Sequence, residues 1–346
     1  MTLSADILMP QAFAFLVSFL AALVLGPMVI EGLRVLKFGQ NINYDAPARH
    51  LQKQGTPTMG GVLMVLGVGI TLLAGVLFTH WLRPPSPQLV AVVLVFLAHA
   101  LLGFADDYLK IRRGKSLGLL ARQKLAGQVV ITLAFVAYLF LTAQRNFTTE
   151  VVVWRGQTWD WGYGYYVFAF LLMIGLSNAV NLTDGLDGLA GGLALLAALG
   201  LAWAIHVLPA GFDQLPLFNY ALAGSCLGFL WYNAHPAKVF MGDTGSLAIG
   251  GSLAAMALLS KQELVLLVFA AMFLLEIGSV ILQVLYFKAT KGKRIFKMSP
   301  LHHHFELSGV EETQVVARFW IGGVIALTLG LLLSGFVWVL PGSGVR

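Results

Sequence analysis

The chain has 346 residues, of which 58% are hydrophobic and only 11% are charged, and its mean hydropathy is +0.81. A soluble domain carries about 25% charged residues, so this composition excludes an ordinary water-soluble protein and indicates a membrane protein. The net charge of +6 does not indicate nucleic-acid binding, because the basic residues lie in short loops between apolar runs. The single cysteine, Cys226, excludes an intramolecular disulfide.

Apolar runs long enough to cross a bilayer recur along the whole chain. A crossing needs about 20 mostly apolar residues, and the sequence predicts about ten, near 9–31, 58–79, 87–105, 125–142, 166–182, 188–207, 217–234, 245–260, 262–287 and 316–340. The first run lacks a basic leader and a cleavage site, which favours a retained span over a signal peptide. The ninth is long and contains Glu276 and Gln283, so we expect it to tilt, break or extend into the cytoplasm.

The basic residues predict the orientation of these spans. Alternate loops carry 17 of the 22 lysines and arginines, and such loops face the cytoplasm. With an even number of spans, both termini are then periplasmic. No repeat, linker or low-complexity segment divides the chain, so we expect residues 1–346 to form one integral membrane domain of the all-α class.

The longest outer loop, residues 143–165, differs in composition from the spans. It contains a β-branched run, a Gly-Gln turn and an aromatic cluster in TTEVVVWRGQTWDWGYGYY. This pattern predicts a short periplasmic β-hairpin at the membrane interface, with the tryptophans and tyrosines as interfacial anchors.

Five carboxylates lie in three short motifs at the predicted cytoplasmic ends of spans. These are Asp106 and Asp107 in GFADDYLK, Asp184 and Asp187 in NLTDGLDGLAGG, and Asp243 in VFMGDTGS. A single acid in such a place could simply mark the membrane boundary. Three motifs on one side, with accompanying glycines and asparagine, indicate a functional site. Hard oxygen ligands that leave coordination positions for phosphate suit Mg²⁺.

Aspartate spacing permits two further expectations. If the segment around Asp184 and Asp187 is helical, the two acids share a face. Asp106 and Asp107 would point about 100° apart on a helix, so that one could face a substrate while the other is held by a basic partner.

Basic and histidine residues complement the acids. Lys53, before GTPTMGG, and Lys124, after the Asp106–Asp107 motif, are candidate phosphate partners, although lysines at these places also fit the topology signal. His302, His303 and His304 are consecutive and lack the spaced partners of a zinc site. Their imidazoles could instead hydrogen-bond phosphate or carboxylate oxygens.

Five segments together carry a family resemblance. GTPTMGG (55–61), FADDYLK (104–110), NLTDGLDGLA (181–190), NAHPAKVFMGDTGSLA (233–248) and SPLHHHFE (299–306) resemble the phospho-N-acetylmuramoyl-pentapeptide transferase (MraY) family. The aspartate motifs are shared with the wider polyprenyl-phosphate N-acetylhexosamine-1-phosphate transferase superfamily. GTPTMGG and LHHHFE look specific to the muramoyl-pentapeptide branch.

The resemblance implies an activity, a cofactor and a set of site residues. The implied reaction transfers phospho-MurNAc-pentapeptide from UDP-MurNAc-pentapeptide to undecaprenyl phosphate, giving lipid I and UMP at the bacterial inner membrane. The resemblance also implies that the enzyme requires Mg²⁺ and is a homodimer. Asp243 matches the magnesium-binding aspartate, and the catalytic set comprises Asp106, Asp107, Asp243, Lys53, Lys124 and His302. The substrate-binding set comprises Thr58, Asn181, Asp184, Gly185, Leu186, Asp187, Asn233, Phe240, Gln283, His303 and His304, with Phe240 stacking on uracil.

Two alternatives are separable by experiment. The LHHHFE motif argues against a UDP-N-acetylglucosamine-1-phosphate transferase of the same superfamily, and assaying both nucleotide sugars would decide. A transporter would place polar groups near mid-span, whereas these acids cluster at one face. A vesicle flux assay beside a lipid-product assay would separate a transporter from a transferase.

Overall fold

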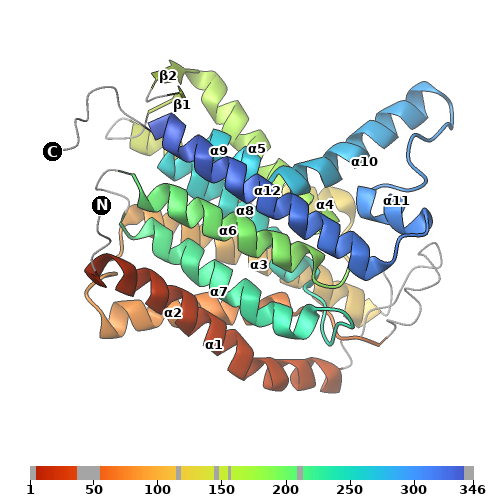
Figure 1. Ribbon diagram of the computed structural model, residues 1–346, viewed down its shortest axis with the longest axis horizontal. Coiled ribbons are helices and arrows are strands. Elements are labelled where there is room, and N and C mark those ends of the chain that lie inside the picture. Colours follow the sequence, from red (N-terminus) through yellow and green to blue (C-terminus); the bar gives the residue numbers. More distant parts are fainter. Residues whose placement is uncertain are drawn as a thin grey trace.

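The computed structural model describes residues 5–36, 55–113, 118–143, 148–154, 157–208 and 213–338. Within these ranges the chain is mostly helical. The helices are α1 (Ala5–Val35), α2 (Gly61–Phe78), α3 (Pro87–Arg113), α4 (Ala121–Ala143), α5 (Tyr163–Thr183), α6 (Leu189–His206), α7 (Leu215–Asn233), α8 (Gly242–Ser260), α9 (Glu263–Phe269), α10 (Ala271–Ala289), α11 (Leu301–Leu307) and α12 (Glu312–Trp338). Figure 1 shows most of the long helices side by side in one bundle, with α10 projecting from it.

Every predicted span corresponds to helix, but the spans are not all alike. Eight helices of the described chain are long and apolar enough to cross a membrane, namely α1 to α6, α10 and α12. The predicted ninth span is broken near Ala270 into the short α9 and the longer α10. The predicted third span was too short, since α3 continues to Arg113, so that Asp106 and Asp107 lie on a helix and not in a loop.

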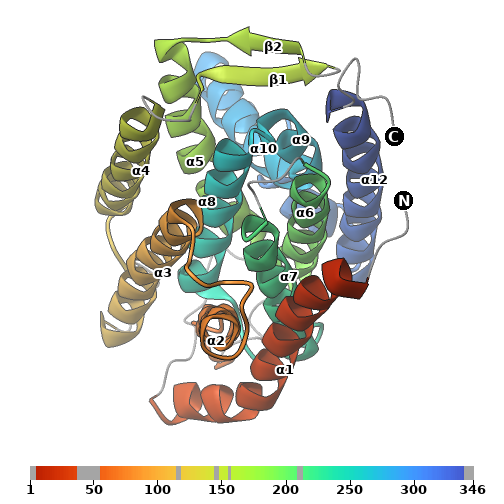
Figure 2. The same ribbon diagram turned by 90° about the vertical axis from the view of Figure 1, so that its left-hand side faces the viewer.

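Helix α8 lies in the middle of the bundle (Figure 2). All its residues from Asp243 to Ser260 are buried. Glycines let neighbouring helices approach it closely: a Cβ at Gly103 of α3 would lie 2.1 Å from the carbonyl oxygen of Asp243, and a Cβ at Gly61 of α2 would lie 2.1 Å from the nitrogen of Gly245. Small residues allow this kind of contact between membrane helices. The close packing places the start of α8 directly against α3.

The predicted hairpin is confirmed. Strand β1 (Glu150–Trp154) pairs antiparallel with β2 (Gln157–Asp160), with Glu150 opposite Asp160. It precedes α5, whose other end reaches Asp184, so the hairpin and the aspartate motifs lie at opposite ends of the bundle. We call these the hairpin end and the acidic end. The start of α1 and the end of α12 both lie at the hairpin end (Figure 1), as an even number of crossings requires.

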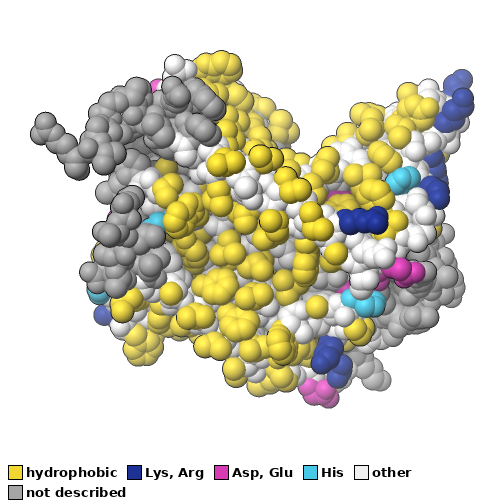
Figure 3. All heavy atoms as spheres, in the orientation of Figure 1, with side chains coloured by type: hydrophobic (Ala, Val, Ile, Leu, Met, Phe, Trp, Pro, Cys, Tyr) yellow, Lys and Arg dark blue, Asp and Glu magenta, His cyan; other side chains and the backbone are white. Residues whose placement is uncertain are grey.

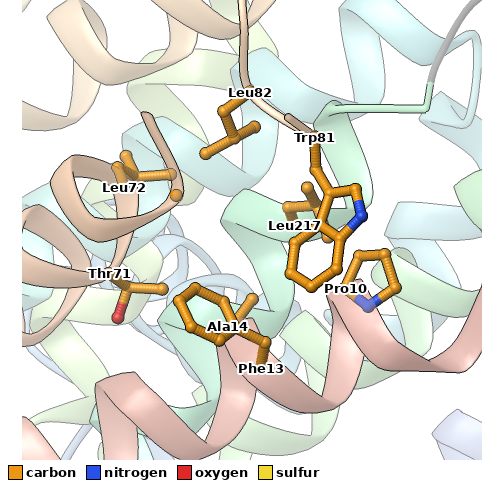
Figure 4. A pocket seen from close by; sticks show the side chains of 9 residues that line it. Pro10, Phe13, Ala14, Thr71, Leu72, Trp81, Leu82 and Leu217 are labelled. Atoms are coloured by element: carbon orange, nitrogen blue, oxygen red, sulfur yellow. The ribbon is translucent and has the colours of Figure 1, made fainter. Parts of the chain in front are cut away.

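The surface divides in the same way. Hydrophobic side chains cover the middle of the face drawn in Figure 3, whereas most of its charged side chains gather at the acidic end. A small crevice near the hairpin end, between α1, α2 and α7, is lined by Phe13, Trp81, Leu82 and other residues, none of them titratable (Figure 4). Its only hydroxyl, on Thr71, donates to the carbonyl of Gly67. This crevice is a packing feature and offers no chemistry.

A buried ion pair lies at the hairpin end, between the C-terminus of α8 and α9. The Lys261 Nζ is 4.0 Å from Glu263 Oε1 and 4.0 Å from the ring centroid of Tyr165, whose hydroxyl donates to Glu263. Burial raises the pKa of the Glu263 carboxyl to about 7, against the opposing effect of the Lys261 charge.

This shift predicts a pH dependence of stability. The unfolded chain loses the Glu263 proton near its ordinary pKa of 4.5 and the folded chain only near 7, so the folded state binds more protons between these values. The free energy of unfolding should therefore fall as pH rises from about 4.5 to 7, by on the order of 1 kcal/mol per unit at most. Thermal unfolding in detergent measures this effect: from pH 5 to pH 7 the stability should fall less for Glu263→Gln than for the unchanged protein. Equal falls would contradict the assignment.

Candidate active site

Three carboxylates meet at the acidic end, where α3 packs against the start of α8. Asp106, Asp107 and Asp243 each offer an oxygen, and these three oxygens lie within 4.8 Å of one another. All three residues are buried, with exposed fractions of 3%, 1% and 8%. We call this group the acidic triad. Ionised groups this close and this enclosed require cations between them.

Lys110 provides one such cation. Its Nζ is 2.6 Å from Asp106 Oδ2, 3.1 Å from Asp243 Oδ2 and 3.3 Å from Asp107 Oδ1. The helix creates this contact, because residues three and four positions apart share a face. A positive charge therefore already lies among the three carboxylates, where a metal ion would also find its oxygen ligands.

Lys124 of α4 approaches the triad from another side. Its Nζ donates to Asp243 Oδ2 and to Asn181 Oδ1, each at 2.8 Å. The Asn181 amide in turn donates to Asp243 Oδ1 at 2.7 Å and to Ser246 at 2.9 Å. Both oxygens of Asp243 are thus oriented by side chains from other helices, which makes Asp243 the most highly connected acid of the site.

The other two triad members are fixed by backbone groups. Asp107 Oδ2 accepts hydrogen bonds from the Thr244 backbone N–H at 3.0 Å and from its hydroxyl at 2.9 Å, at the N-terminus of α8. Asp106 Oδ1 accepts one from the Leu119 N–H at 2.7 Å. In each acid the other oxygen faces Lys110. These hydrogen bonds and ion pairs hold the two carboxylates in place before any ligand binds.

Asp184 adds a fourth acid beside the triad. It ends α5, and its Oδ2 accepts the N–H of Gly242 at 3.1 Å. Burial raises the pKa of its carboxyl above the ordinary value, and the charges of Asp243 and Asp107 raise it further. With Asp184 included, the described residues of the cluster contain four carboxylates and two lysines. The triad alone has three carboxylates against two lysines, and this excess of negative charge suits a divalent cation.

Asp187 does not share a face with Asp184, since residues 184–188 form a turn and not a helix. Its Oδ2 is 3.0 Å from His235 Nδ1 and accepts the Ala237 N–H at 3.1 Å, while its own N–H donates to Glu312. Asn233 supports the same turn, because its Oδ1 accepts the Gly188 N–H at 3.0 Å. Asp187 and Asn233 therefore shape the turn next to the triad. The buried Leu186 lies between the two acids.

The GTPTMGG segment lies beside the VFMGD segment. Phe240 donates its N–H to Pro57, and the Gly60 and Gly61 N–H groups donate to Phe240 and Met241 at 2.7 and 2.9 Å. This pairing places Thr58 near the start of α8, where a Cβ on Gly242 would lie 2.9 Å from the Thr58 hydroxyl oxygen. The Phe240 side chain is half-buried.

The LHHHFE motif forms α11, held against α10. Gln283 accepts the N–H groups of Ile295 and Phe296 and donates to the carbonyl of Phe296, which fixes the loop before α11. His304 Nδ1 accepts the Lys297 N–H at 3.1 Å, and His303 Nδ1 is 2.9 Å from Glu306 Oε2. His302 is fully buried and its ring reaches the 184–188 turn, whereas Gln283 and His304 hydrogen-bond residues of the loop.

The turn leaves no room for a side chain at Gly185, because a Cβ there would lie 2.3 Å from His302 Nε2. Gly185→Ala should therefore displace the turn that carries Asp184 and Asp187. Small displacements of positioning groups can cost up to about 10²-fold in rate, so we expect a 10- to 100-fold loss of turnover. Gly175→Ala, on α5 with open space around it, is the matched control and should retain activity. Full activity of Gly185→Ala would show that the turn tolerates the shift.

The predicted site is thus largely brought together. Asp106, Asp107, Asp184, Asp243, Lys124, Asn181 and Thr58 converge on the start of α8. Gly185 and His302 meet at the neighbouring 184–188 turn, and Lys53 lies outside the described residues. Sequence reasoning missed Lys110, Thr244, His235, Glu276 and Glu312 as members of the network. Only Lys110 carried a usable signal, since it follows the two aspartates at helical spacing.

The sequence of the chain matches known proteins over most of its length. A model of glycosyl transferase family 4 matches residues 89–261, and the phospho-N-acetylmuramoyl-pentapeptide-transferase signature 1 matches residues 53–65. Phospho-N-acetylmuramoyl-pentapeptide-transferases from Shouchella clausii (strain KSM-K16) and Bacillus subtilis (strain 168) are 48% and 45% identical, each over 94% of this chain and 98% of their own. The chain belongs to the phospho-N-acetylmuramoyl-pentapeptide-transferase family. A relative of the same name from Moorella thermoacetica (strain ATCC 39073 / JCM 9320) is 48% identical over 90% of this chain and 94% of its own.

Family membership explains the two kinds of motif. The family 4 match contains Asp106, Asp107, Asp184, Asp187 and Asp243, whereas the signature contains GTPTMGG, which we predicted to be specific to this branch. The chain is accordingly a multi-pass membrane enzyme of the MraY family.

Proposed function

We propose that this chain transfers phospho-MurNAc-pentapeptide from UDP-MurNAc-pentapeptide to undecaprenyl phosphate, the first membrane step of peptidoglycan synthesis. The observation that carries the chemistry is the acidic triad, joined by two lysines at one end of an apolar helical bundle. That position suits a reaction between one water-soluble and one lipid-embedded substrate.

The reaction requires one bond to form and one to break. An oxygen of the lipid phosphate attacks the β-phosphorus of the UDP-sugar, the bond from that phosphorus to the bridging oxygen breaks, and UMP leaves with the electron pair. Both reactants are anionic, so neutralisation of charge is the first requirement, followed by alignment of the two phosphates. Lys110 and Lys124 are placed to contribute positive charge, and Lys53 is expected to add to it.

The donor set fits Mg²⁺. Asp243 would hold the ion, with Asp106 and Asp107 as the other oxygen ligands, and the Lys110 ammonium already in contact with all three acids supports a cation site there. When bound, the ion would neutralise phosphate oxygens and stabilise the charge that develops during transfer.

Among the acids, Asp106 is our candidate for orienting or deprotonating the lipid phosphate. The second pKa of a phosphate lies near 6, so the dianion is already common at neutral pH and general-base help is a small part of the rate. In the competing scheme an aspartate is the nucleophile and carries the phospho-sugar. Isolation of a transfer-competent adduct formed without lipid acceptor would contradict direct attack.

The remaining residues are proposed to bind the nucleotide sugar. The turn with Asp184, Gly185, Leu186 and Asp187 lies next to the GTPTMGG and VFMGD segments, so Thr58, Asn181, Asn233 and the half-buried Phe240 surround one region. Phe240 is proposed to stack on uracil, whereas His303, His304 and Gln283 are proposed to meet the sugar and peptide. We further propose that the acidic end faces the cytoplasm, that both termini are periplasmic and that the enzyme is a homodimer.

The decisive experiment uses the purified full-length protein. UDP-MurNAc-pentapeptide, polyprenyl phosphate and Mg²⁺ should together give UMP and a lipid-linked product, and chelation of the metal should stop both. Substituting UDP-N-acetylglucosamine should give no product. Product from UDP-N-acetylglucosamine alone would assign the chain to the sister activity, and the absence of UMP with either sugar would contradict a transferase.

A further inference from the structure

Glu276 is a fully buried carboxylate that none of the steps above uses. It lies on α10 among mostly apolar residues and has an exposed fraction of 0%. A buried carboxylate is costly unless hydrogen bonds compensate it. Its partners therefore indicate what it is there to hold.

Both oxygens of Glu276 are directed at one residue, His302. Oε1 accepts the His302 backbone N–H at 3.2 Å, and Oε2 is 3.2 Å from the ring Nδ1. An ionised carboxylate only accepts hydrogen bonds, so Nδ1 must carry the proton. In the neutral ring, Nε2 is then left as an acceptor.

The other ring nitrogen of His302, Nε2, is buried and has no hydrogen-bond partner among the described residues. It lies against Gly185, in the turn that carries Asp184 and Asp187. A buried polar atom without a partner is destabilising because it has lost its hydrogen bonds to water, and such atoms in native structures call for a functional explanation. The turn connects directly to the triad, since Asp184 accepts the Gly242 N–H next to Asp243.

We propose that Glu276 is a positioning residue for the transfer reaction, which acts by holding the proton of His302 on Nδ1 so that Nε2 faces the Asp184–Gly188 turn as an acceptor. This inference rests on the proposed function, because it assigns Glu276 and His302 to the same site. His302 is the group that meets the turn, and Glu276 acts through it.

Glutamine at position 276 would invert this arrangement with almost no change in size. The His302 backbone N–H can only donate, so it requires the glutamine oxygen. The glutamine NH₂ then faces Nδ1 and donates to it, which moves the ring proton to Nε2. In serine proteases the corresponding change of an aspartate leaves the geometry intact yet lowers kcat about 10⁴-fold through the wrong tautomer. Carboxylate partners of metal-bound histidines contribute about 10- to 100-fold, and we expect a loss of kcat in that range.

The test combines two variants that separate charge from size. Glu276→Gln keeps the size and removes the carboxylate, whereas Glu276→Asp keeps the carboxylate and shortens the side chain. If the tautomer matters, Glu276→Asp should retain more of kcat than Glu276→Gln. If only packing matters, the aspartate should be the worse variant, and this order would overturn the proposal. Glu263→Gln is the matched control, because it makes the same change at another buried glutamate, at the hairpin end, and should leave kcat unchanged.

A spectroscopic measurement reads the tautomer directly. ¹⁵N NMR of histidine-labelled full-length protein, with the His302 signals assigned by loss in His302→Asn, should show Nδ1 protonated and Nε2 bare. In Glu276→Gln, Nε2 should be protonated and Nδ1 bare. An unchanged tautomer in that variant, or unchanged kcat, would overturn the inference. A protein without any UMP release would instead overturn the proposed function, while the tautomer would still be measurable.

Discussion

Asp243→Asn is expected to reduce turnover by on the order of 10²-fold or more, because a bound metal supplies several kcal/mol to charge stabilisation. Asparagine keeps the shape of the side chain and an oxygen that can accept the hydrogen bond from the Asn181 amide. It loses the negative charge that faces Lys110 and Lys124 at 3.1 and 2.8 Å. UMP release at several Mg²⁺ concentrations would measure the effect.

The control for Asp243→Asn is Asp213→Asn, at an exposed aspartate before α7. It should leave both turnover and the Mg²⁺ requirement unchanged. Wild-type turnover of Asp243→Asn at ordinary Mg²⁺ would refute the assignment of Asp243 as a metal ligand. A similar loss of turnover in both variants would indicate a general effect of removing a negative charge.

Lys110→Met is expected to have the second large effect, on stability as well as on turnover. The ammonium contacts three buried carboxylates, and breaking a buried ion pair costs about 3–5 kcal/mol because the remaining charge is uncompensated. In metal-free buffer the variant should therefore unfold at a lower temperature than the unchanged protein. Added Mg²⁺ should restore more stability to the variant, since a dication can occupy the space among the three acids.

Thermal unfolding in detergent with and without Mg²⁺ measures this without any assay of activity. Lys288→Met, at an exposed lysine on α10, is the control and should respond to Mg²⁺ like the unchanged protein. If Lys110→Met showed no greater response than this control, the acidic triad would not be the metal site.

Several features of the fold followed from local patterns. The length and apolar character of each run predicted helices at all ten places, because a crossing needs a fixed length and internal hydrogen bonding. The β-branched run and turn before α5 predicted the hairpin. The length and two polar residues of the ninth span led us to expect it to tilt, break or extend into the cytoplasm, and the structure shows a break near Ala270.

The candidate site was predictable as a set of residues, but its contacts were not. Asp106 and Asp107 were expected near a loop, yet α3 extends past them, and only that extension brings Lys110 onto their face. Asp184 and Asp187 were expected to share a face if helical, yet the turn directs one to Gly242 and the other to His235. The spacing of Lys110 indicated its contact only on condition that the helix continues past Asp107, and both outcomes depend on where a helix stops.

The acidic loops and motifs, the membrane class and the family resemblance were thus determined by the sequence itself, because hydropathy, spacing and motif identity are local properties. Tertiary structure alone decided that Lys124 and Asn181 meet Asp243, and that Glu276 holds His302. These pairs are separated by 26 to 119 positions along the chain. These contacts depend on how the helices pack against one another, with small residues letting α2, α3 and α5 approach α8 closely and α11 lying against α10, and no local pattern encodes that packing.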